Sequence, residues 1–97
     1  MHVISRPELI KFWKKHPDAE VPLKIWFKNV KQAKWNSVNE LKKQFTTADY
    51  IGNNRVVFNI KGNHYRIVVL VFFTGQKMFI RFIGTHAEYD KIDAKNA

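Results

Sequence analysis

The chain contains no cysteine, which excludes disulfides, thiolate metal sites and a cysteine nucleophile. Its hydrophobic runs are short, and the run from Ile67 to Phe73 has the length of one strand, far below the ~20 apolar residues that span a membrane. The segment from Met1 to Pro7 lacks the apolar stretch of a secretory signal peptide. We therefore expect a cytoplasmic protein with no membrane association.

Acidic residues are scarce. Eight Asp and Glu stand against 17 Lys and Arg, which gives a formal net charge of +9 and an isoelectric point near 10.0. Such a surplus attracts polyanions and accelerates their encounter with the protein. Nucleic acid is the first candidate partner, ahead of an anionic membrane or an acidic protein.

Apolar residues are plentiful for a chain of this length. Hydrophobic residues make up 45% of the 97 residues and aromatic residues 14%, which excludes a disordered chain. The length suits one domain and leaves no room for two. We expect a single domain over residues 1–97.

The first half of the chain has the spacing of amphipathic helices. Ser5-x-x-Glu8 is the pattern of a capping box, and the helix after it should end near His16-Pro17. Pro22 suits the first turn of a second helix. Ser37-x-x-Glu40 predicts a third, shorter helix through Leu41 to Phe45. The apolar residues at helical spacing in the first two helices are Leu9, Phe12, Trp13, Leu23, Trp26, Phe27 and Val30.

After Asn53-Asn54 the pattern changes to three β-branched and aromatic runs, Val56 to Ile60, Tyr65 to Phe73 and Met78 to Ile83. They predict a three-stranded antiparallel meander, and His2 to Ile4 fits a further short strand. We therefore expect an α+β fold in which N-terminal helices pack on one face of a small antiparallel sheet.

Both hairpins fit two-residue loops, Gly62-Asn63 and Gly75-Gln76, with glycine first as a type II′ turn requires. This register places Ile60 opposite Tyr65 and Phe73 opposite Met78. One face then becomes a continuous apolar surface for the helices, made of Val56, Phe58, Ile60, Tyr65, Ile67, Val69, Val71, Phe73, Met78, Ile80 and Phe82. The opposite, open face receives Arg55, Asn59, Lys61, His64, Arg66, Arg81 and Thr85, with Val57, Val68, Leu70, Phe72, Phe79 and Ile83 over its other part.

Two arginines on the open face, Arg66 and Arg81, should lie near each other in a region where the strands supply no carboxylate. Unpaired guanidinium groups suit an anion, and a phosphodiester accepts bidentate contacts from arginine. The alternative is that Asp49, Glu88 or Asp90 reaches them from a loop.

Chemically active side chains follow the third strand directly in Gly84-Thr85-His86-Ala87-Glu88-Tyr89-Asp90-Lys91. RNA cleavage without metal needs a base for the 2′-OH, cations for the crowded phosphorane and an acid for the 5′ oxygen. Histidine is the usual acid or base near neutral pH, and tyrosine or lysine serves when neighbouring cations lower its pKa. The structural alternatives are that His86 caps a helix, Tyr89 packs in the core and Asp90 pairs with Lys91.

Other chemistries find no support in the sequence. It has no glycine-rich phosphate loop and no nucleophile elbow. The four histidines lack metal-ligand spacing, and the scattered carboxylates do not suit a two-metal nuclease. We expect neither a metal nor a cofactor.

The segments Val57-Phe58-Asn59-Ile60-x-Gly62-Asn63-x-Tyr65-Arg66 and Ile83-Gly84-Thr85-His86-Ala87-Glu88-Tyr89-Asp90-Lys91-Ile92 resemble the HigB family of type II toxins, within the RelE-like group. The resemblance implies a RelE-like α+β fold and cleavage of mRNA on the translating ribosome, which inhibits translation. It also implies inhibition by a cognate HigA-like antitoxin with a helix-turn-helix domain, and contact with operator DNA only through that antitoxin.

The resemblance also suggests site residues. The candidate catalytic residues on matching positions are Arg66, Arg81, His86, Tyr89 and Lys91. The candidate RNA-contact residues are Arg55, Lys61 and His64. His86 would act as base or acid with Tyr89 or Lys91 as its counterpart, and the arginines would bind the phosphate.

Two other functions fit parts of the pattern. A non-catalytic RNA-binding module would need exposed aromatic side chains for base stacking, and here Phe72 and Phe79 lie away from the basic half of the face. A basic interaction protein would need only an acidic partner. RNA cleavage separates the enzyme from both.

Overall fold

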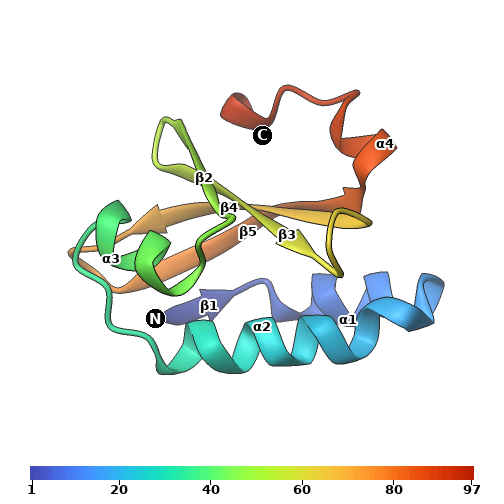
Figure 1. The fold of residues 1–97 in the computed structure, drawn as a ribbon, viewed down its shortest axis with the longest axis horizontal. Helices are drawn as coiled ribbons and strands as arrows, with labels where there is room; N and C mark the ends of the chain where they lie inside the picture. The colour runs from blue at the N-terminus through green and yellow to red at the C-terminus, as the bar shows by residue number, and fades with distance from the viewer.

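A computed structural model describes all 97 residues and contains a five-stranded sheet flanked by helices. Figure 1 shows α1 and α2 on one side of the sheet, while the C-terminal segment lies on the other. No helix is long and apolar enough to cross a membrane. The elements, in chain order, are β1 (His2–Ile4), α1 (Arg6–Lys15), η1 (Pro17–Ala19), α2 (Glu20–Gln32), α3 (Val38–Gln44), β2 (Asp49–Gly52), β3 (Arg55–Ile60), β4 (Tyr65–Phe72), β5 (Lys77–Thr85), α4 (His86–Tyr89) and η2 (Ala94–Asn96).

The three N-terminal helices form where their apolar spacing predicts them, and each buries residues of the predicted apolar stripe. In α3 the Ser37 hydroxyl accepts a hydrogen bond from the Glu40 amide at 3.3 Å, which confirms the predicted start. The capping box predicted at Ser5 is wrong. Ser5 has φ +78° and offers its main-chain oxygen, not its hydroxyl, to the Glu8 amide.

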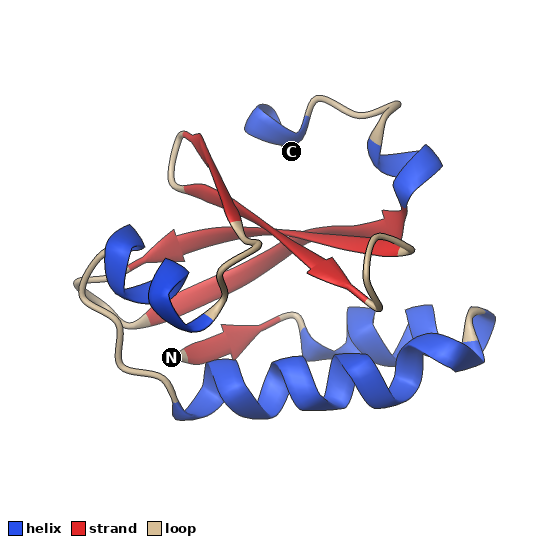
Figure 2. Cartoon of the chain, viewed as in Figure 1, coloured by secondary structure: helices blue, strands red, loops and turns tan.

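The meander β3–β4–β5 is confirmed as antiparallel, in the sheet order β1-β5-β4-β3-β2. β1 forms at the predicted place but pairs parallel to β5, so the prediction of a purely antiparallel sheet is wrong at this edge. The strand β2 was not predicted. It is a short edge strand in which Ile51 is the one aliphatic side chain. The helices on one face confirm the α+β prediction (Figure 2).

The first hairpin has the predicted register, with Ile60 opposite Tyr65. The second does not: Val71, not Phe73, lies opposite Met78, so the loop has four residues. Its Gln76 side chain donates to the main-chain oxygens of Phe73 at 2.8 Å and Trp35 at 2.6 Å. This tertiary contact fixes a longer loop than the glycine alone suggests. Because the shift is two residues, it leaves the face assignment of this part of β5 unchanged.

A β-bulge in β5 changes the faces beyond it. Val69 pairs with Ile80, but Val68 pairs with Phe82, so Arg81 is the extra residue. The prediction that Phe82 lies under the helices and Ile83 on the open face is therefore wrong, because each occupies the other's side. Thr85, predicted on the open face, pairs with Tyr65 of the helix-side core.

The face predicted to be open is partly covered. Beside the main core of 21 residues, a small cluster forms on the other side of the sheet around Val57, Val68 and Ala94. Phe82, Tyr89 and Ile92 pack against it. The C-terminal segment thus folds back and leaves only part of this face exposed.

Candidate functional site

Arg66 and Tyr89 meet on the sheet face opposite the helices. The Arg66 guanidinium carbon lies 4.6 Å from the centroid of the Tyr89 ring, a cation–π contact. Arg66 forms none of the four ion pairs of the structure, and its buried Nε has no hydrogen-bond partner. The alternative of a carboxylate partner for Arg66 is therefore wrong, and its charge remains available to an anion.

The turn from β5 into α4 places Tyr89 beneath Arg66. Thr85 and Glu88 form a full capping box, with the Thr85 hydroxyl accepting from the Glu88 amide at 3.2 Å and the Glu88 carboxylate accepting from the Thr85 amide at 2.8 Å. The Thr85 N–H holds the pKa of Glu88 below its usual value. The sequence pattern Thr-x-x-Glu at Thr85 and Glu88 signals this cap. Thr85, not His86, is the cap.

His86 begins α4, and its Nδ1 lies 3.1 Å from the Asp90 carboxylate. Asp90 therefore pairs with His86 and not, as the structural alternative has it, with Lys91. The His86 amide donates to the main-chain oxygen of His64 at 3.2 Å, which extends the β4–β5 pairing by one residue. The structure thus brings His64, a predicted RNA contact, next to the predicted catalytic His86.

Arg55 and Arg81 form a second group on the same face. The Arg55 Nη2 and the Arg81 Nε both donate to the main-chain oxygen of Ala97, at 3.0 and 3.3 Å. Arg81 lies at the bulge beside Val68 and Val69, whereas Arg66 pairs with Gly84. The two predicted catalytic arginines therefore have separate contacts, Arg66 with the Tyr89 ring and Arg81 with the Ala97 oxygen.

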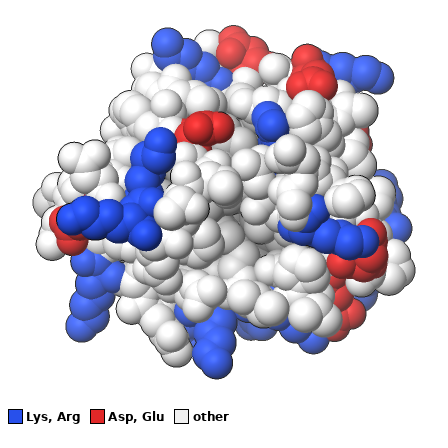
Figure 3. Space-filling model, in the orientation of Figure 1, with Lys and Arg blue, Asp and Glu red and all other residues white.

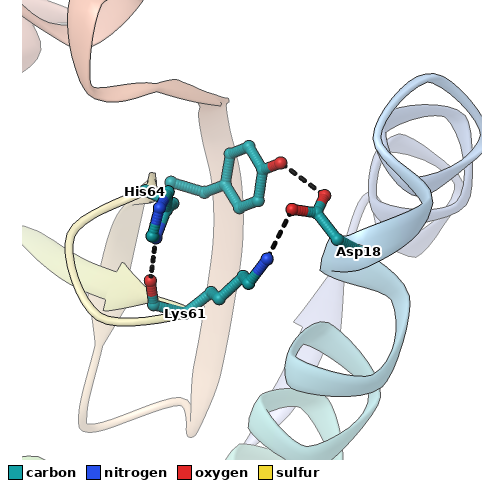
Figure 4. Close-up of polar contacts among 4 residues, drawn as sticks. Asp18, Lys61 and His64 are labelled. Carbon is teal, nitrogen blue, oxygen red and sulfur yellow. Dashed lines mark hydrogen bonds and ion pairs between the residues drawn. The ribbon is translucent and has the colours of Figure 1, made fainter.

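Lys61 lies toward the helix layer and not, as predicted, on the open face. Its ammonium is 2.6 Å from the Asp18 carboxylate, whose other oxygen accepts from the Tyr65 hydroxyl (Figure 4). Lys61 and then Tyr65 lower the pKa of Asp18, and the same bond to Asp18 raises the pKa of Tyr65. Asp18 was missed because nothing in its local sequence relates it to residues more than 40 positions away.

Lys91, the remaining predicted catalytic residue, is exposed just beyond α4. The excess positive charge is spread widely: Figure 3 shows Lys and Arg side chains over several parts of the visible surface, with few Asp or Glu between them. The charge therefore acts as a general attraction for polyanions. The specific geometry is confined to the residues around Arg66, Tyr89, His64 and His86.

Comparison with known proteins identifies the family. Residues 19–92 match the family described as HigB toxin, the RelE-like toxic component of a toxin–antitoxin system. The chain belongs to the HigB toxin family. This toxin is 33% identical over 93 residues to the mRNA interferase toxin HigB of Escherichia coli K12, covering 93% of this chain and 88% of that protein.

Two further relatives agree. The mRNA interferase HigB of Shigella flexneri is also 33% identical over 93 residues, with the same coverage of 93% and 88%. The mRNA interferase HigB of Escherichia coli O6:H1 is 27% identical over 94 residues, covering 95% of the toxin and 91% of the relative. The region matched by the family contains every candidate site residue, from Arg55 to Lys91. A toxin of this family has a cognate antitoxin as its partner.

Proposed function

We propose that this HigB-family toxin inhibits translation by cleaving mRNA on the ribosome, without metal, through attack of the 2′-OH on the neighbouring phosphate. The observation that carries this proposal is Arg66. Its guanidinium lies over the Tyr89 ring and has no carboxylate partner, and the backbone-bonded His64 and His86 lie two residues before Arg66 and three before Tyr89. A cation held in this way suits the charge that develops on a phosphorane.

The contacts support the following roles. Arg66 binds the scissile phosphate, while Arg81 and Arg55, already turned toward a main-chain oxygen, bind a neighbouring one. His86 acts as acid or base, with Tyr89 or Lys91 as its counterpart. Lys61 and His64 contact the RNA strand, Lys61 only when a phosphate competes with Asp18.

Metal-free chemistry is consistent with the donors present. No three His, Asp or Glu side chains lie close enough together to share one metal ion. The carboxylates of this region are engaged: Glu88 with the Thr85 amide, Asp90 with His86 and Asp18 with Lys61. The ribosome would supply the geometry of the substrate, so that few catalytic groups suffice.

We further propose that the toxin acts in the cytoplasm and is inhibited by a HigA-like antitoxin with a helix-turn-helix domain. Operator DNA is then contacted only through the antitoxin. The family membership supports a cognate antitoxin.

The test uses purified toxin and ribosomes programmed with an mRNA of defined sequence. The expected products carry a 2′,3′-cyclic phosphate and a 5′-hydroxyl. A single 2′-deoxynucleotide on the 5′ side of the cut should abolish cleavage at that position alone. Ends with 5′-phosphate, or cutting that tolerates the deoxynucleotide, would contradict 2′-OH attack. RNA binding without any cut would leave a non-catalytic RNA-binding module.

A further inference from the structure

We propose that His64 and His86 form a general base and general acid pair. His64 then has the role of counterpart to His86 that Tyr89 or Lys91 would otherwise have. This inference rests on the proposed ribonuclease function. In the backbone, Tyr65 pairs with Thr85, and the His86 amide donates to the His64 main-chain oxygen at 3.2 Å. The two histidines are therefore opposite each other at the end of the sheet.

Directly opposite residues of an antiparallel pair have Cβ atoms about 5 Å apart. Tyr65 belongs to the helix-side core, so alternation places its strand neighbour Arg66 on the opposite side, where it covers the Tyr89 ring. His64 lies in the turn just before β4, with its ring 6.3 Å from the Tyr65 ring. The two histidines are thus close in the chain to the Arg66–Tyr89 contact, since His64 lies two positions before Arg66 and His86 three positions before Tyr89. Both are accessible: His64 is exposed, and the His86 side chain is 45% exposed.

Each histidine is held through the same ring nitrogen. The His64 Nδ1 lies 2.8 Å from the Lys61 main-chain oxygen, and the His86 Nδ1 lies 3.1 Å from the Asp90 carboxylate. A carbonyl and a carboxylate only accept hydrogen bonds, so both Nδ1 atoms carry a proton. Both Nε2 atoms are then left for proton transfer, because the bond at one ring nitrogen fixes the role of the other.

The partners also distinguish the two roles. The Lys61 oxygen is neutral and satisfies a neutral His64 ring, which is the form that a base needs. The Asp90 carboxylate forms an ion pair with His86 when that ring is protonated, which is the form that an acid needs. His64 is accordingly the base and His86 the acid.

The loop that carries His64 is anchored to the helix layer. Asp18 binds both Lys61 and Tyr65, the residues that flank this loop, and the Lys61 main chain holds the His64 ring (Figure 4). Several charged and titratable groups surround the pair. They are Lys61, Tyr65 and Arg66 from β4 and its loop, Asp18 from η1, Lys15 and His16 from the end of α1, Glu88, Tyr89 and Asp90 from α4 and its C-cap, and Lys91 after it. Asp18 and Glu88 are occupied by other partners, so Asp90 is the carboxylate that acts on the pair.

The His64 Nε2 removes the 2′-OH proton while the 2′ oxygen forms a bond to phosphorus. The bond from phosphorus to the 5′ oxygen breaks, and that oxygen takes a proton from the His86 Nε2. The products are a 2′,3′-cyclic phosphate and a 5′-hydroxyl, and exchange with water restores the two rings.

The experiment compares His64→Asn and His86→Asn on programmed ribosomes. Asparagine keeps a donor near the position of Nδ1 and removes Nε2. His2→Asn is the matched control, because His2 is exposed and pairs with Lys77 at the far end of β5. Both site variants should cleave at least about 100-fold more slowly than the native toxin, as loss of an acid or base predicts. The control should cleave at the native rate.

A second substrate separates the roles. An mRNA with sulfur in place of the 5′-bridging oxygen at the cut has a leaving group that needs no acid. It should restore His86→Asn to near the native rate and leave His64→Asn slow. A His64→Asn variant that cleaves ordinary mRNA like the control would overturn the pair, and rescue of His64→Asn by sulfur would overturn its assignment as base. A native toxin that makes no cut would instead overturn the proposed function, and the pair with it.

Discussion

At the scale of single residues, a few side-chain contacts hold the charged groups of the molecule in place. Arg66 is held by an aromatic ring and not by a carboxylate, so its charge is positioned without being neutralised. By contrast, both carboxylate oxygens of Asp18 have partners, one the Lys61 ammonium and the other the Tyr65 hydroxyl. Each arrangement predicts a different response to substitution.

Replacing Arg66 should impair cleavage far more than stability. Arg66→Ala should slow cleavage by about 100-fold or more, because removal of one preorganised donor from a transition state costs that much. The stability loss should be about 1 kcal/mol, the size of a cation–π contact. Arg66→Lys keeps the charge and should recover part of the rate. A variant that unfolds and loses activity in parallel would make Arg66 structural.

The Asp18 contacts predict a pH dependence of stability. The pKa of Asp18 is lower in the folded state than its unfolded value near 3.8. The contribution of Asp18 to the stability of the fold is therefore present above the unfolded pKa and is lost as the pH falls through the lower, folded pKa. The melting temperature of the native toxin should therefore fall more on acidification below about pH 4 than that of Asp18→Asn. Equal falls would show that these contacts add nothing to folding.

At the scale of elements, sequence patterns predicted those helices, strands and turns that depend on residues close together in the chain. The helices α1, α2 and α3 and the meander follow from spacing, and the register of the first hairpin follows from its turn. The four-residue loop before β5 depends on a contact between distant segments, the Gln76–Trp35 hydrogen bond, and neither the bulge at Arg81 nor the strand β2 follows from alternation. No alternation pattern contains that information.

The turn at Gly84 makes a prediction for the element that positions Tyr89. A Cβ at Gly84 would lie 2.6 Å from the Phe82 ring and 3.1 Å from the Glu88 carboxylate that caps α4. Gly84→Ala should therefore cost about 1–3 kcal/mol of unfolding free energy, measured by denaturant titration. Gly75→Ala is the control, because a Cβ there meets nothing closer than 3.9 Å. Equal effects of the two substitutions would contradict a close approach at Gly84.

At the scale of the whole molecule, the predicted two-layer arrangement gains a third part, the C-terminal segment that covers part of the second sheet face. Four of the predicted site residues, Arg66, Tyr89, His64 and His86, come together, while Arg55 and Arg81 form their own group and Lys61 faces the helices. Sequence identified the residue types. Their grouping required the bulge, the cap of α4 and the fold-back of the chain, which are tertiary features.

The net charge of +9 makes a prediction for RNA binding as a whole. Affinity for a single-stranded RNA oligonucleotide should fall with added salt, by about 0.7 logarithmic units per tenfold salt for each phosphate contacted. Arg66→Ala should reduce that slope by about 0.7. Lys11→Ala, on α1 and paired with Glu8, should leave it unchanged. An unchanged slope for Arg66→Ala would mean that no phosphate binds there.

Cleavage of mRNA through Arg66 and His86 is tested most directly by primer extension on a translated reporter mRNA. The native toxin, Arg66→Ala and His86→Ala are each induced briefly and compared. We predict new 5′ ends within translated codons for the native toxin, and none for either variant or for an untranslated copy of the message. Absence of new ends with folded, expressed native toxin would contradict mRNA cleavage. Ends that persist in both variants would show that the active site lies elsewhere.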